Sequence, residues 1–232
     1  MATIYAVGVG PGDPELLTRK AERILLSVDV ILAPVSNPAE ASVALGTIRG
    51  FIDEERQEVI VHQFPMTSDK ARLIPAWQEA AALIAAHAEA GRSVAFITIG
   101  DPLFYSTFIY LLRILREQWP HLPIEVIPGI SSINAAAAEA ALPLVEGDEK
   151  MVVIPATAGI EQIKNGLAGY ETVVLLKVKP LYAEIIELLR TTGREQRTIF
   201  VERVGSSRQK VLTDYSEIAA HAPDYLSLMI IK

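Results

Sequence analysis

Three segments of this 232-residue chain combine glycine, acidic and hydroxyl residues at spacings that suit a small charged ligand. The first segment, residues 8–14, reads Gly-Val-Gly-Pro-Gly-Asp-Pro and follows an apolar run. Glycines let the backbone turn tightly, and the amide groups that open the next helix attract anions. A tight turn with Asp13 as helix cap and Pro14 at the first helical position explains part of the same pattern. A ligand-binding loop and a purely structural turn therefore both stay open.

The second and third segments follow two further apolar runs. Residues 98–107 read Thr-Ile-Gly-Asp-Pro-Leu-Phe-Tyr-Ser-Thr, and residues 125–132 read Glu-Val-Ile-Pro-Gly-Ile-Ser-Ser. Taken alone, Asp101 is explained as a turn or cap acid before Pro102, and Ser131 or Ser132 as the cap of the alanine-rich helix that follows. Each segment stands where an apolar run passes into a helical one, which is the edge where open α/β sheets bind ligands.

A nicotinamide dinucleotide site is the first alternative that the glycine-rich turn raises. Its fingerprint requires the spacing Gly-x-Gly-x-x-Gly and an acidic residue near the end of the second strand. Here Gly8 and Gly10 are followed by Asp13 in place of the third glycine, and residues 31–34 read Ile-Leu-Ala-Pro. The sequence therefore disfavours a Rossmann dinucleotide site.

The elements that must position these segments alternate between short apolar strands and amphipathic helices. In the first half we expect strands at 3–8, 28–33, 58–62, 93–99 and 124–127, and helices at 14–27, 71–90 and 106–117. In the second half we expect helices at 132–141, 159–168 and 181–191, and strands at 151–155, 171–178, 197–203, 208–212 and 226–231. The pattern predicts two α/β domains with mainly parallel sheets, residues 1–129 and 130–232, and an antiparallel finish.

Composition narrows the class of protein. Half of the residues are hydrophobic, as in folded globular proteins, and the absence of cysteine excludes disulfides and thiolate metal sites. The net charge of −7 argues against binding nucleic acid, whose phosphates attract basic proteins. The four histidines lack metal-ligand spacing, so we expect no bound metal. The first residues lack the basic start of a signal peptide and no apolar run is long enough for a bilayer span, so we expect a cytoplasmic protein without membrane contact.

The three segments, in this order and spacing, resemble the motifs of the tetrapyrrole methylase family. Members of this family are class III S-adenosylmethionine-dependent methyltransferases. The resemblance extends to residues 202–205, Glu-Arg-Val-Gly, and residues 225–229, Tyr-Leu-Ser-Leu-Met, and so covers essentially the whole chain. Gly-Asp-Pro followed by Phe-Tyr-Ser-Thr-Phe is most similar to the subgroup that methylates C20 of precorrin-2 or cobalt-precorrin-2 in cobalamin biosynthesis. The resemblance implies a cofactor cleft between the two domains, a homodimer, and no protein-bound metal.

The resemblance also implies which residues contact S-adenosylmethionine. Asp101 would bind its ammonium group, Ser106 and Thr107 its carboxylate, and Ser131 and Ser132 its methionine or ribose portion. Backbone groups of Leu176, Lys177 and Leu228 would lie near the adenine. The remaining cofactor-binding residues implied by the matching motifs are Pro11, Thr98, Gly100 and Phe104.

Methyl transfer from a sulfonium needs alignment and a dry site more than a catalytic triad. The meso carbon that receives the methyl group must lose a proton, and the candidate acceptors are Tyr105, Glu202 and water. The acetate and propionate groups of the substrate call for local basic residues. The densest basic stretch comprises Arg194, Arg197, Arg203, Arg208 and Lys210, while Lys177 and Lys179 end an apolar strand. An ordinary solvated surface also explains any one of these basic residues.

Three other functions remain open. The chain could methylate another tetrapyrrole position or another target of the same family, which product mass and regiochemistry would reveal. It could be a carrier that binds a tetrapyrrole without turnover. A nicotinamide dehydrogenase is the third, and a spectroscopic test for NADH binding would decide it.

Overall fold

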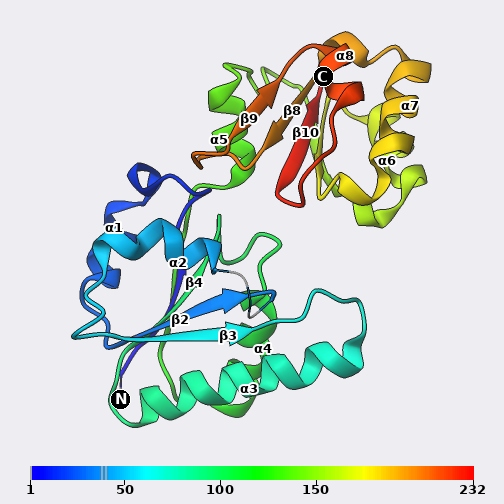
Figure 1. Cartoon of the computed structure of the whole chain (residues 1–232). Coiled ribbons are helices and arrows are strands. Elements are labelled where there is room, and N and C mark those ends of the chain that lie inside the picture. The colour runs from blue at the N-terminus through cyan, green and yellow to red at the C-terminus, as the bar shows by residue number, and fades with distance from the viewer. Residues whose placement is uncertain (1, 38, 40) are drawn as a thin grey trace. The chain divides into compact units, whose positions relative to one another are not determined.

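The computed structural model describes residues 2–37, 39 and 41–232, and divides them into two compact units, Met1–Ser131 and Ser132–Lys232. The first unit contains β1 (Ile4–Gly8), α1 (Arg19–Leu25), β2 (Val30–Val35), α2 (Val43–Ile48), β3 (Glu58–Gln63), α3 (Lys70–Glu89), β4 (Val94–Thr98), α4 (Phe108–Gln118) and β5 (Ile124–Ile127). The second contains α5 (Ser132–Glu139), β6 (Met151–Pro155), α6 (Ile160–Gly169), β7 (Thr172–Leu176), α7 (Tyr182–Thr192), β8 (Thr198–Glu202), β9 (Lys210–Leu212), α8 (Tyr215–Ala220) and β10 (Ser227–Ile231). Figure 1 labels most of these elements.

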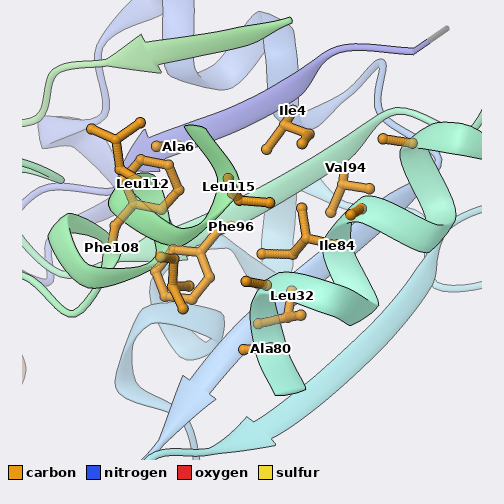
Figure 2. Packing of buried hydrophobic residues seen from close by; sticks show 14 of the residues in the cluster. Ile4, Ala6, Leu32, Ala80, Ile84, Val94, Phe96, Phe108, Leu112 and Leu115 are labelled. Carbon is orange, nitrogen blue, oxygen red and sulfur yellow. The ribbon is translucent and has the colours of Figure 1, made fainter. Parts of the chain in front are cut away.

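The first sheet has five strands in the order β3-β2-β4-β1-β5, all paired in parallel. Successive residues of each strand face opposite sides, so two hydrophobic clusters form. One packs α3 and α4 against one face and surrounds Phe96 and Phe108 (Figure 2). The other packs α1 and α2 against the opposite face, around Ile31 and Ile97. These two clusters confirm the prediction of a parallel sheet that is buried on both faces.

The strand order places a switch point between β1 and β4. The chain leaves β1 toward α1 on one face of the sheet, and leaves the neighbouring β4 toward α4 on the other face. Two adjacent strands whose connections diverge in this way leave a crevice at their carboxyl ends, which is where open α/β sheets bind ligands. The two motif segments that follow β1 and β4 begin at this switch point.

The second sheet has the order β6-β7-β10-β8-β9. Only β6 and β7 pair in parallel, whereas β10 is antiparallel to both of its neighbours and β9 is antiparallel to β8. The predicted α/β class and antiparallel finish are confirmed, but the expectation of mainly parallel strands holds for the first sheet alone. The short connection from β8 to β9 suits an antiparallel pair and not a crossover, and β10 lies between β7 and β8 and runs antiparallel to both.

Several predicted boundaries shift in the structure. The helix expected at residues 14–27 is a short 3-10 turn, Pro14–Leu16, followed by α1. The break occurs because the Thr18 side chain accepts a hydrogen bond from the Ala21 amide at 3.1 Å and starts a new helix. The sequence reading missed α2 and α8, which are only six residues long, although Ser42 and Asp214 supply their caps.

A buried tyrosine makes the stability of the second unit sensitive to high pH. The hydroxyl of Tyr182 donates to the Ile218 carbonyl at 2.8 Å, and burial, with a smaller contribution from the charge of Glu202, raises its pKa to about 12. An exposed tyrosine in the unfolded chain titrates near pH 10, so the folded state retains its proton longer. This contribution to stability is complete below about pH 10 and is lost as the pH rises toward 12.

We therefore expect the free energy of unfolding to fall by on the order of 2 kcal/mol between pH 10 and 12 through this group. Tyr182→Phe starts less stable by about 1 kcal/mol because the hydrogen bond is gone, but lacks this pH-dependent loss. Urea unfolding followed by circular dichroism at several pH values measures both proteins. Parallel pH curves for the two proteins would contradict the prediction.

Candidate ligand-binding edges of the two units

The loops after β1 and β4 are joined by backbone hydrogen bonds at the switch point. The Val9 amide donates to the Thr98 carbonyl at 2.9 Å, and the Gly100 amide donates to the Gly10 carbonyl at 2.8 Å. Gly10 and Gly100 have φ values of 74° and 71°, a conformation in which a side chain would be strained. The glycines therefore let the two loops continue side by side beyond the strands.

A third loop, after β5, packs against the other two through glycine backbones. A Cβ atom added to Gly129 would lie 2.1 Å from the Gly100 carbonyl oxygen and 2.8 Å from the Gly8 Cα. A Cβ added to Gly8 would lie 2.5 Å from the same oxygen. These distances leave no space for any side chain, so close backbone approach fixes glycine at both positions.

The Asp101 carboxylate links two of these loops. Its Oδ1 atom accepts a hydrogen bond from the Leu103 amide at 2.8 Å, and its Oδ2 atom accepts one from the Gly129 amide at 3.1 Å. The side chain thus closes its own turn, as the structural interpretation of the sequence expects, and also holds the loop after β5. Each carboxylate oxygen can accept more than one hydrogen bond, so contact with a cationic group remains compatible with this arrangement.

The hydroxyl residues predicted here differ in their surroundings. Ser106 and Thr98 are buried, and the Ser106 hydroxyl donates to Thr98 Oγ1 at 3.1 Å while accepting from the Phe108 amide at 3.2 Å. Ser106 therefore fixes the start of α4, and its single proton is used within the protein. Thr107 is only partly buried, directly before α4.

The other predicted residues of the first unit lie in the same three loops. Pro11 is buried in the loop after β1, whereas Phe104 and Tyr105 are exposed in the loop after β4. Ser131 is partly buried, and its Cα lies 4.0 Å from the position of a Cβ built on Gly100. The structure therefore brings the predicted residues of this unit to one edge of the first sheet.

Four predicted residues of the second unit, Leu176, Lys177, Glu202 and Leu228, lie at or next to one edge of its own sheet. Leu176 at the end of β7 is the register partner of Leu228 in β10, and Glu202 at the end of β8 is the partner of Ser227. Lys177 follows β7 with a φ of 56°. Ser132 begins α5 in this unit and is partly buried.

Glu202 is 7% exposed and organises the segment before β10. Its Oε2 atom interacts with His221 Nε2 at 3.1 Å and accepts from the Asp224 amide at 2.6 Å. Asp224 in turn forms an ion pair with Arg203. Burial raises the pKa of the Asp224 carboxyl, but hydrogen bonds from the Tyr225 amide and Arg203, with the charges of Arg203 and Lys179, outweigh burial and lower this pKa. Sequence reasoning missed His221 and Asp224, because no local spacing links them to Glu202.

The basic residues that are dense in the sequence separate in the structure. Arg194 and Arg197 line a hollow of about 730 Å³, together with Thr198 at the start of β8 and Lys232. This hollow lies at the edge of the second sheet opposite Leu176 and Glu202, because it adjoins the start of β8. Of the five residues of the basic stretch, the other three lie near Glu202: Arg203 follows it directly, Lys210 is its register partner in β9, and Arg208 lies in the loop between β8 and β9. Lys177 and Lys179, which are not part of this stretch, follow β7.

Within the described residues, no group of three or more histidine or acidic side chains is arranged to hold a metal ion. The helices in that part of the chain include none that is both long and apolar enough to cross a bilayer.

Comparison with known proteins gives concordant matches. The model of the tetrapyrrole (corrin/porphyrin) methylases matches residues 3–219. Cobalt-precorrin-2 C(20)-methyltransferase of Salmonella typhimurium is 39% identical over 82% of this chain and 78% of its own length. Precorrin-2 C(20)-methyltransferase of Sinorhizobium is 33% identical over 98% of this chain and 94% of its own length.

A solved structure shares the fold. Uroporphyrin-III C-methyltransferase of Thermus thermophilus, in complex with S-adenosylhomocysteine, superimposes with a TM-score of 0.69 at 24% identity, covering 99% of this chain and 92% of that one. At this identity the likeness supports the α/β fold of the chain.

Proposed function

This chain belongs to the tetrapyrrole (corrin/porphyrin) methylase family, and from that premise we propose that it methylates C20 of precorrin-2 or cobalt-precorrin-2 with S-adenosylmethionine. The observation that carries the proposal is the identity of 39% with the Salmonella C(20)-methyltransferase over most of both chains. The relatives named for the cobalt-containing and the cobalt-free substrate are both similar, so the two substrates stay alternatives. The reaction belongs to cobalamin biosynthesis.

The first unit offers donors and acceptors that suit S-adenosylmethionine. Asp101 is a partly buried carboxylate that holds two loop amides and has further acceptor capacity, which fits an ammonium group. No side chain fits at Gly8 or Gly129, and Gly100 has a φ of 71°, so the three loops approach one another through their backbones beside Asp101. Thr107 and Ser131 add hydroxyl groups at the same edge. We propose that Asp101, Thr107 and Ser131 contact S-adenosylmethionine. The residues that shape the surroundings of this site are Pro11, Thr98, Gly100, Phe104 and Ser106.

In the second unit we propose that Leu176, Lys177 and Leu228 contact the adenine and that Ser132 contacts the methionine or ribose portion. Their support is the pairing of Leu176 with Leu228 at the edge where β7 ends. When bound, S-adenosylmethionine supplies an electrophilic methyl group. The chain then has to orient the two reactants and exclude water, which the glycine loops and apolar strand ends favour.

The proton that leaves the substrate carbon requires an acceptor. Tyr105 is 48% exposed, whereas Glu202 is buried and its Oε2 atom is engaged with His221 and the Asp224 amide. Because Tyr105 stands in solvent and Glu202 is engaged, these surroundings favour water as the acceptor. Glu202 serves to position the segment before β10. For the substrate carboxylates we propose Lys177, Lys179 and Arg203 in preference to Arg194 and Arg197, which lie at the opposite edge of the sheet.

We also propose that the protein works as a cytoplasmic homodimer. Light scattering coupled to gel filtration measures the oligomeric state.

The first experiment is a calorimetric titration with S-adenosylhomocysteine, for which we expect micromolar binding. The second supplies S-adenosylmethionine with a ¹³C-labelled methyl group and precorrin-2, with and without cobalt, and locates the label by NMR. We expect a single new methyl group at C20. Uroporphyrinogen III is the control substrate and should remain unmethylated.

Each other outcome identifies a different function. A label at another carbon indicates another regiospecificity within the family. Binding of precorrin-2 without transfer indicates a carrier. Failure to bind S-adenosylhomocysteine in the presence and absence of precorrin-2 would overturn the proposal.

A further inference from the structure

The loop after β4 exposes three consecutive large apolar side chains. Leu103, Phe104 and Tyr105 are 51%, 40% and 48% exposed, although each would be expected to avoid water. They directly follow Asp101 and Pro102 at the edge where the three glycine loops meet. A contiguous exposed apolar run next to a polar site is typical of a surface that contacts a ligand.

Tyr105 holds its backbone in an unfavourable conformation. Its φ of 53° lies in the left-handed region, which costs free energy for a bulky L-residue. The neighbouring residues impose it: Asp101 accepts from the Leu103 amide on one side, and Ser106 is buried and bonded to Thr98 on the other. Strain that the surroundings maintain in this way occurs most often at functional sites.

The strained backbone determines where the ring lies. Neighbouring side chains along a chain normally point in different directions. Here the rings of Phe104 and Tyr105 lie 4.9 Å apart, centroid to centroid, at an interplanar angle of 77°. The pair forms a corner of two aromatic rings that both remain accessible, which suits a large ligand with an apolar ring face.

We propose that Tyr105 contacts the ring system of the tetrapyrrole substrate. The inference rests on the proposed function. If Asp101 binds the methionine end of the cofactor, the loop that carries Asp101 and Tyr105 lies near the sulfonium methyl group, and the ring-shaped ligand that must approach this methyl group is the methyl acceptor. The contact is made by the face of the Tyr105 ring and does not require its hydroxyl group.

Two substitutions distinguish the contribution of the Tyr105 ring from those of the loop conformation and of the hydroxyl group. Glycine adopts a φ of 53° without strain, so Tyr105→Gly removes the ring while leaving the loop conformation favourable. We expect a melting temperature no lower than that of the unchanged protein, unchanged affinity for S-adenosylhomocysteine, and a KM for the tetrapyrrole raised roughly 10-fold or more. Tyr105→Phe keeps the ring and should leave both KM and kcat within about 3-fold.

The control is Tyr170→Ala, because Tyr170 is 38% exposed but lines the hollow at the opposite edge of the second sheet. This substitution should change neither the affinity for S-adenosylhomocysteine nor the KM for the tetrapyrrole. A KM for Tyr105→Gly within about 2-fold of the unchanged protein would overturn the inference, as would an equal loss of S-adenosylhomocysteine affinity. A loss of kcat in Tyr105→Phe would also overturn it, since the hydroxyl would then matter. If the unchanged protein itself fails to methylate, the proposed function fails instead.

Discussion

Gly129→Ala should lower the free energy of unfolding of the first unit by about 3 kcal/mol or more and abolish S-adenosylhomocysteine binding. The added Cβ would lie 2.1 Å from the Gly100 carbonyl oxygen and 2.8 Å from the Gly8 Cα. These are backbone atoms of loops that are themselves bonded together, so they cannot move aside as a flexible side chain would. The loops must separate, which also breaks the hydrogen bond from the Gly129 amide to Asp101.

Urea unfolding followed by tryptophan fluorescence measures this effect in the correct unit, since both tryptophans, Trp77 and Trp119, belong to the first unit. The matched control is Gly46→Ala, because Gly46 lies in α2 and a Cβ there meets no atom within 4 Å apart from its chain neighbours and the backbone of its own helix. We expect the control to be more stable by about 0.5–1 kcal/mol. If the free energy of unfolding of Gly129→Ala lies within about 1 kcal/mol of that of the unchanged protein, the three loops are not packed together as described.

Asp101→Ala should weaken S-adenosylhomocysteine binding by as much as about 3 kcal/mol, or roughly 100-fold. Two causes act together. The substitution removes the proposed partner of the ligand ammonium group, and it leaves the Leu103 and Gly129 amides without their carboxylate acceptor. The affinity of Asp101→Asn for S-adenosylhomocysteine should lie between those of the unchanged protein and Asp101→Ala. The asparagine side-chain oxygen can accept from one backbone amide, while the side-chain NH2 group faces the other amide and cannot accept from it.

Calorimetric titration measures this affinity, and Asp69→Ala provides the control. Asp69 also accepts a hydrogen bond from a backbone amide, that of Ala71 at 2.9 Å, but it caps α3 far along the chain from the motif loops. The control should lose about 1 kcal/mol of stability and no ligand affinity. Equal losses of affinity in both variants would mean that general destabilisation, and not the Asp101 carboxylate, explains the result.

Local patterns in the sequence determined the class of fold and the family. Apolar runs of strand length alternate with helical periodicity, and this specifies parallel strands covered on both faces in the first unit. The three motif segments in register carry the family resemblance, which the match over residues 3–219 confirms. Short helices such as α2 escaped detection because six residues contain less than two turns of periodic signal.

Only the tertiary structure decided which residues act on one another. Asp101 reaches the Gly129 amide across 28 positions of sequence, and Glu202 meets His221 across 19. The structure also separated basic residues that are close in sequence, because β8 carries Arg197 and Arg203 to opposite ends of the sheet. A five-residue strand displaces its two ends by about 15 Å, so adjacency along the chain does not give adjacency in a site. Long-range contacts arise from strand order and loop packing, which no local pattern encodes.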